Sequence, residues 1–198
     1  PVTDGTVHLG GKDVTASPPR RRFGSGLCYI PEDRLGVGLA PRLSVVENAV
    51  LRTYRGHRRG PFLVASRMTA HCRDLVDRFG VRTGPLEDPI AGLSGGNLQR
   101  LLVGRELSSR PEVVVAAQPT RGLDVQGVKA IQDLLVAERD SGTAVLLISE
   151  DLDELLTLAD RLLVMHDGRI VAEFDPADSE RNVIGEAMAG HLTGEGVA

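Results

Sequence analysis

Two short apolar runs in the second half of the chain constrain the fold most strongly. Val113 to Ala117 and Ala144 to Ile148 consist of apolar residues only. Between them, Val128, Ile131, Leu134 and Leu135 repeat at helical spacing and mark the inner face of a helix. Continuous apolar strands that alternate with amphipathic helices predict a parallel sheet covered on both faces. The expected fold class is therefore α/β.

Further elements follow from the same periodicity. A short buried strand is predicted at Leu27 to Ile30, and Ser44 is a candidate N-cap for a helix over Leu43 to Leu51. An amphipathic helix through Cys72 and Phe79 is expected to end at Gly80. Other predictions are a helix from near Ser94 to about Ser109, helical spacing from Leu152 to Ala159, a β-hairpin through Asp167-Gly168, and a closing helix over Ser179 to Ala189.

Composition excludes several classes of protein. The chain has 198 residues and a net charge of −4, so its overall charge does not attract nucleic acid. No apolar stretch approaches the roughly 20 residues that a membrane-spanning helix needs. Cys28 and Cys72 stand far apart and fit no metal-binding or redox spacing, which indicates reduced, structural cysteines. No metal site is expected.

The segment Leu93 to Arg100 is the sharpest candidate for chemistry. Its residues Ser94, Gly95 and Gly96 open a predicted helix, and glycines let a phosphate approach the backbone without a Cβ in the way. The free N–H groups and the positive end of the helix dipole favour an anion there. Taken alone, Ser-Gly-Gly is more often an ordinary N-cap, so the surrounding motifs decide.

Those motifs resemble the ATPases of ABC transporters. Leu93 to Arg100 matches the family's signature motif, Val113 to Ala117 its Walker B strand, and Gly122-Leu123-Asp124 its D-loop. A strand that ends at Ile148, followed by Glu150, matches the position of its switch residue. Together with Tyr29 to Arg34, these segments look most like the second, C-terminal ATPase half of bacterial importers for simple sugars and nucleosides.

The resemblance implies a single domain fragment over residues 1–198. Its core is a parallel sheet like that of P-loop ATPases, with a small antiparallel β part. Residues 34–109 are expected to form an inserted helical subdomain that carries the signature. Residues 1–33 and 110–198 are expected to form the ATPase core.

The chain departs from the family pattern at the catalytic positions. The family ends its Walker B strand with an aspartate that supports Mg²⁺ and a glutamate that polarises the attacking water, where this chain has Ala117 and Gln118. Loss of a general base typically costs about 10²–10⁴-fold in rate. The switch position, usually histidine, is Glu150, and the Q-loop position, usually glutamine, is Glu32. An acid beside a γ-phosphate would repel it.

A phosphate-binding Walker A loop is not found in these residues. That loop ends in Gly-Lys followed by Ser or Thr, whereas the only Gly-Lys here, Gly11-Lys12, precedes Asp13. The first residue is Pro1, and the expectation is a chain that begins after the phosphate loop of a longer protein.

The resemblance also implies how such a chain functions. ABC ATPase halves pair head to tail, so ATP with Mg²⁺ lies between one half's Walker motifs and the other half's signature. This chain is expected to offer Ser94, Gly95, Gly96, Asn97 and Gln99, with the D-loop residues Gly122, Leu123 and Asp124, to a partner half. Its own ATP site is expected to be inactive.

The implied partners are a second ATPase half, a transmembrane permease and, indirectly, a solute-binding protein, at the cytoplasmic face of the cell membrane and without nucleic acid. The resemblance implies that the helix over Leu43 to Leu51 and the segment after it belong to the helical subdomain, which contacts the permease in this family. Simple packing in the core is the alternative role for this helix, and the two roles are compatible. Two alternatives stay open: a non-catalytic regulatory or dimerisation module, and a soluble ABC ATPase unrelated to transport.

The arginine clusters Arg20 to Arg22 and Arg55 to Arg59 allow two interpretations. They could face anionic lipid headgroups near a permease. The plainer interpretation is a solvated charged surface, which is what a charge run usually is.

Overall fold

The structure is a computed structural model that describes residues 2–191. It divides into two compact units, Pro1–Ile148 and Ser149–Ala198, which are described separately. Among the described residues, no helix is both long and apolar enough to cross a membrane.

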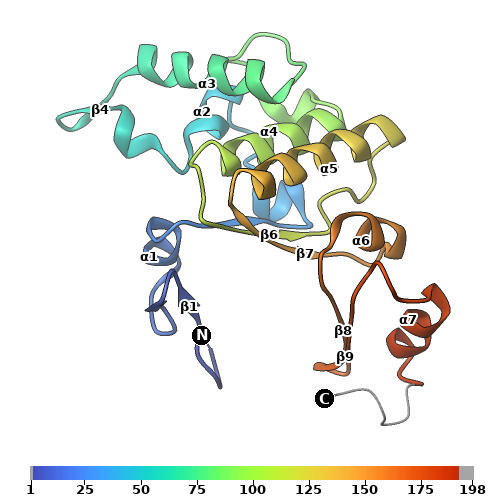
Figure 1. Ribbon diagram of the computed structural model, residues 1–198. Helices are drawn as coiled ribbons and strands as arrows, with labels where there is room; N and C mark the ends of the chain where they lie inside the picture. Colours follow the sequence, from blue (N-terminus) through green and yellow to red (C-terminus); the bar gives the residue numbers. More distant parts are fainter. Residues whose placement is uncertain (1, 192–198) are drawn as a thin grey trace. The chain divides into compact units, whose positions relative to one another are not determined.

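A parallel sheet organises the first unit (Figure 1). Its strands are β3 (Leu27–Ile30), β6 (Val113–Ala117) and β7 (Ala144–Ile148), in the order β3-β6-β7. Both pairings are parallel, with Cys28 opposite Val114 and Val114 opposite Val145. Parallel neighbours need long crossover connections, and helices supply them here. The α/β class with a parallel sheet is therefore confirmed.

Four helices accompany this sheet: α2 (Val45–Val50), α3 (Ala65–Phe79), α4 (Gly95–Leu107) and α5 (Val125–Asp140). Ser44 caps α2 as predicted, because its Oγ accepts from Glu47 N at 3.1 Å while Glu47 Oε2 accepts from Ser44 N at 2.8 Å. Helix α3 ends at Gly80 as predicted, in the left-handed conformation with φ 62°.

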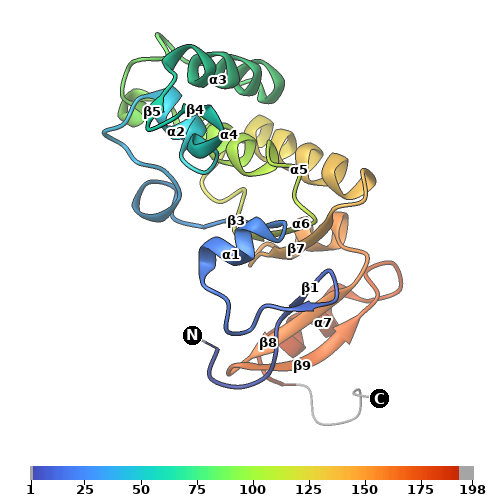
Figure 2. The ribbon, with the colours of Figure 1, turned by 90° about the vertical axis from the view of Figure 1, so that its left-hand side faces the viewer.

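The prediction that both faces of the sheet are covered is wrong for this chain. Helices α4 and α5 lie on one side of the strands, and Ile30, Val114 and Ala116 are fully buried on that face (Figures 1 and 2). On the other face Leu146 and Ile148 are 52% and 50% exposed. The strand β7, which was expected to be buried, is therefore exposed on one face. It is the last strand at one edge of the described sheet.

Shorter elements complete the first unit. The strands β1 (His8–Leu9) and β2 (Lys12–Asp13) form one antiparallel hairpin, and β4 (Arg58–Arg59) and β5 (Phe62–Leu63) form another. These pairs confirm a small antiparallel part. The remaining elements are α1 (Pro19–Gly24), a π-helical turn at Arg34–Gly38, and 3₁₀ turns at Tyr54–His57 and Ile90–Gly92.

The second unit consists of α6 (Leu152–Leu158), the hairpin β8 (Leu162–His166) and β9 (Arg169–Phe174), and α7 (Arg181–Met188). The predicted turn is confirmed, with Asp167 and Gly168 at φ 47° and 74°, which is the left-handed pair that a two-residue hairpin loop requires. The unit has its own small core, formed by Leu162, Val164, Ala172, Ile184 and Ala187. The closing helix α7 is shorter than the predicted Ser179 to Ala189.

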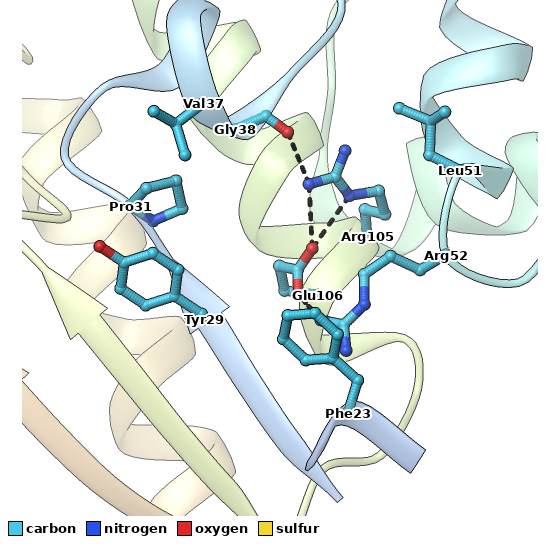
Figure 3. A pocket seen from close by; sticks show the side chains of 9 residues that line it. All are labelled: Phe23, Tyr29, Pro31, Val37, Gly38, Leu51, Arg52, Arg105 and Glu106. Atoms are coloured by element: carbon cyan, nitrogen blue, oxygen red, sulfur yellow. Dashed lines mark hydrogen bonds and ion pairs between the residues drawn. The ribbon is translucent and has the colours of Figure 1, made fainter. Parts of the chain in front are cut away.

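A buried ion cluster connects α4 with Arg52, which follows α2, and with Gly38 of the π-helical turn. Glu106 is 2% exposed, and its carboxylate accepts from Arg105 at 2.9 Å and pairs with Arg52 (Figure 3). Arg105 also donates to Gly38 O at 2.7 Å, and the Arg52 guanidinium lies 4.2 Å above the Phe23 ring. Burial, and then the charge of Arg52, lowers the pKa of Arg105 to about 10, so Arg105 remains protonated at neutral pH.

A leucine of the core and a leucine of the open sheet face should respond differently to truncation. Leu102 is fully buried, so Leu102→Ala should lower the free energy of unfolding by about 2–5 kcal/mol. Leu146, 52% exposed, is the matched control, and Leu146→Ala should cost about 1 kcal/mol or less. Guanidinium denaturation measures both changes, and equal losses would contradict the one-sided burial.

Removal of the carboxylate from the ion cluster should also be costly. Glu106→Ala leaves Arg105 buried without a counter-charge and should destabilise the fold by about 3–5 kcal/mol. The control is Asp133→Ala, which breaks an exposed pair with Lys129 on α5 and should cost about 0.5 kcal/mol or less. Thermal unfolding compares the two variants, and a Glu106→Ala variant as stable as the control would refute the stabilising role of the cluster.

Candidate functional site

The N-terminus of α4 presents the Ser-Gly-Gly segment at the surface. Ser94 is the N-cap, and its Oγ accepts from the Asn97 Nδ2 amide at 2.9 Å. Gly95 and Gly96 are the first helical residues, and the place of a Cβ on Gly96 is open space. The exposed hydroxyl and the first backbone N–H groups can therefore donate to an anion from outside.

Two polar side chains behind this segment hold it in place. Asn97 Oδ1 accepts from Arg82 N at 2.8 Å. Gln99 is 1% exposed, and its Nε2 donates to Pro119 O at 2.6 Å. The structure thus places Ser94, Gly95 and Gly96 on the outside, whereas the Gln99 side chain points inward and ties α4 to the loop that follows β6.

Arg34 joins three segments that are far apart in the sequence. Its guanidinium donates to Gly95 O at 3.3 Å and also to Arg121 O. The Arg121 side chain in turn pairs with the carboxylate of Glu32. Burial lowers the pKa of Arg34. These contacts connect the ends of the neighbouring strands β3 and β6 with the first turn of α4.

The last residue of β6 and the residue after it carry no carboxylate. Ala117 has no side-chain donor atom, and Gln118 offers an amide in place of a carboxylate. Gln118 has a left-handed backbone with φ 48°, and its N–H donates to Ile148 O at 2.8 Å. Within residues 2–191, no group of three or more His, Cys, Asp or Glu side chains could hold a metal ion. The residues at this strand end do not fit Mg²⁺.

The predicted D-loop residues form the connection from β6 to α5. Gly122 is left-handed with φ 68°, and a Cβ there would lie 3.5 Å from Arg34 Nη2. Leu123 packs against the main core. Asp124 is the N-cap of α5, and its Oδ1 accepts from Gly127 N at 2.6 Å. Each of the three residues therefore has a local structural role.

The two remaining predicted positions are acidic and accessible. Glu32 follows β3 by two residues and is engaged with Arg121, so its carboxylate is already neutralised by an ion pair. Glu150 is an exposed residue of the second unit, two residues beyond the end of β7.

Sequence reasoning missed the part played by Arg34 and Arg121. A signal for them existed, because both follow shortly after predicted neighbouring parallel strands, and the carboxyl ends of such strands meet at one edge of a sheet. The hydrogen bond from Arg34 to Arg121 O spans 87 residues, which local spacing does not reveal.

Comparison with known proteins places the chain in a family. The family model described as "ABC transporter" matches residues 1–121. The chain is 42% identical over 193 residues to the glucose import ATP-binding protein TsgD13 of Haloferax volcanii, covering 96% of this chain and 35% of that protein. It is 37% identical to the nucleoside import ATP-binding protein NupA of Lactococcus lactis, covering 96% and 38%. The chain therefore spans little more than a third of the length of these relatives.

A solved structure supports the fold. The dimeric, post-hydrolysis state of the ATP-binding cassette MJ0796, bound to ADP and Pi, superposes with a TM-score of 0.72, covering 88% of this chain and 74% of that one. At 21% sequence identity, this likeness concerns the fold alone. The family model, however, covers more than half of the 198 residues, and the chain belongs to the ABC transporter family.

Proposed function

We propose that the chain is part of the ATP-binding component of an importer for a simple sugar or a nucleoside. The relatives' names support this proposal, since they describe glucose, nucleoside, guanosine and ribose import ATP-binding proteins. In this proposal residues 34–109 form the helical subdomain, with residues 1–33 and 110–198 as the ATPase core. The chain acts peripherally at the cytoplasmic face of the membrane, with a permease and indirectly a solute-binding protein.

Within that component, the chain completes the ATP site of a partner half and does not hydrolyse ATP itself. The observation that carries this proposal is a contrast between the N-terminus of α4 and the end of β6. The N-terminus of α4 is exposed, capped by Ser94 and open above Gly96. The end of β6 has Ala117 and Gln118, which supply neither a metal-binding carboxylate nor a general base.

The chemistry that the chain contributes is stabilisation of negative charge. Backbone N–H groups at a helix N-terminus stabilise phosphate oxygens, and this stabilisation needs no titrating side chain. Arg34 and Gln99 fix the position of that N-terminus. The metal ion and the water-polarising base of the site then come from the partner half, as do the residues that cradle the phosphates.

The permease is proposed to contact the end of α2. Leu51 and Arg52, which follow α2, line a cavity of about 290 Å³ together with Phe23, Tyr29 and Pro31 (Figure 3). Arg105 and Glu106 form the inner part of its lining. Leu51 and Tyr29 are 40% and 42% exposed, so this apolar concavity can receive a side chain of another protein.

Blocking the anion-binding end of α4 tests the proposed contribution. In the assembled transporter, Ser94→Arg should lower ATP turnover by at least about 100-fold, because a bulky side chain fills the space that a partner's phosphate needs. The matched control is Ser66→Arg, an exposed serine in the first turn of α3, which should leave turnover unchanged. Phosphate release measures both, and normal turnover by the Ser94→Arg transporter would overturn the proposal.

The purified chain by itself should not hydrolyse ATP. Addition of an intact partner half should produce turnover that depends on Ser94, whereas Gln118→Glu should not create activity in the isolated chain, because Ala117 still offers no metal ligand. Stable pairing without any stimulation would favour a regulatory or dimerisation module. Hydrolysis by the isolated chain would show that Ala117 and Gln118 do not disable it.

A further inference from the structure

The β4–β5 hairpin exposes two large apolar side chains at its end. Phe62 is 75% exposed and Leu63 is 50% exposed. The hairpin is nevertheless an ordered element, with Arg59 opposite Phe62 and a bond of 2.8 Å from Val64 N to His57 O at its base. Figure 1 shows it as a loop that stands out from α2 and α3. Folding of this chain alone therefore leaves these two side chains largely in water.

The chain segment that contains the hairpin has only positively charged side chains. Residues 48–73 contain six arginines and no aspartate or glutamate, in a chain whose net charge is −4. Five of these arginines are exposed and, among the described residues, have no acidic partner within ion-pair distance: Arg55, Arg58, Arg59, Arg67 and Arg73. The first four, which lie on the hairpin or within a few residues of it in the sequence, are named the basic hairpin surface together with Phe62 and Leu63.

The other arginine cluster of the chain, Arg20 to Arg22 on α1, has a different arrangement. Arg22 on α1 donates to Val14 O at 3.2 Å and to Thr15 O at 2.7 Å, so its guanidinium is used inside the unit. The neighbouring Phe23 is 40% exposed, and its ring lies against the Arg52 guanidinium at 4.2 Å. The α1 cluster therefore has no aromatic side chain as exposed as Phe62, which is 75% exposed.

We propose that the basic hairpin surface binds the anionic face of a lipid bilayer. Guanidinium groups form paired hydrogen bonds with phosphate, and a membrane interface accepts arginines at the headgroups and apolar side chains just below them. A nucleic acid would engage the arginines but has no apolar layer for Leu63. The joint presence of an aromatic ring, an aliphatic side chain and two arginines on the hairpin, with Arg55 and Arg67 in the elements beside it, fits a bilayer.

Such a contact would orient the chain at the membrane independently of a permease. The cations supply long-range attraction, which salt weakens, and Phe62 and Leu63 supply a short-range contribution that salt does not weaken. This contact goes beyond the proposed role in ATP turnover and does not depend on Ser94 or on a partner half.

Vesicle binding tests the proposal. The full chain is sedimented with phosphatidylcholine vesicles that contain or lack phosphatidylglycerol, at low and high salt. Binding is expected only with the anionic vesicles. Arg58→Gln/Arg59→Gln should lower the partition coefficient by about fivefold per arginine, or about 25-fold together. The matched control, Arg20→Gln/Arg21→Gln on α1, removes the same charge and should change it by less than about twofold.

A second variant separates bilayer insertion from charge alone. Phe62→Ser keeps every arginine and should weaken binding severalfold, with the loss persisting at high salt, while circular dichroism remains unchanged. Absence of binding to anionic vesicles would overturn the proposal, as would equal losses from the two double arginine variants. Binding that Phe62→Ser leaves intact, and that heparin displaces, would identify a general polyanion surface instead. Because the vesicles contain neither permease nor ATP, these outcomes are independent of the Ser94→Arg test.

Discussion

The geometry of the site depends on the Arg34 guanidinium, which holds the Gly95 and Arg121 carbonyl groups at once. Helix α4 is buried along most of its length, so its axis is set by the core, but the orientation of its first turn needs a separate constraint. Arg34 supplies that constraint from the π-helical turn after β3, and Gln99 supplies it from inside through Pro119 O. A planar fork of donors suits this task because it can satisfy two carbonyl groups in a fixed relative position.

Local patterns in the sequence predicted the helices and strands well. They predicted poorly which faces of these elements are buried by the rest of the chain. The helix termini at Ser44, Gly80 and Ser94 were predictable because capping depends on a few neighbouring residues. The exposure of Ile148 could not be predicted, because an apolar strand has the same composition whether or not other elements cover its second face. The inward orientation of Gln99 could not be predicted either. No sequence pattern distinguishes a side-chain amide that faces a ligand from one that donates to a backbone carbonyl inside the protein, as Gln99 does to Pro119 O.

The distribution of charge separates two kinds of arginine in this chain. Arg105 is buried, and its charge is balanced by Glu106, so its contribution is internal and depends on the pair remaining intact. Arg58 and Arg59 lie on a short exposed hairpin in a segment without acidic residues. A chain with an overall negative charge gains no stability from concentrating cations there, since like charges repel. Together with the exposed Phe62 and Leu63, this concentration is the observation from which we infer a partner with negative charge.

The two halves of an ATP site differ in how easily substitution removes them. An anion site at a helix N-terminus is made of backbone N–H groups, and it persists as long as the capping residue and the glycines keep the approach open. A metal-dependent hydrolytic centre instead needs particular carboxylates, which the side chains of Ala117 and Gln118 do not supply. The residues at these two positions need not affect Ser94, because α4 is fixed by Arg34 and Gln99. The function that we propose rests on this independence, since it needs an open N-terminus of α4 and no catalytic group at the end of β6.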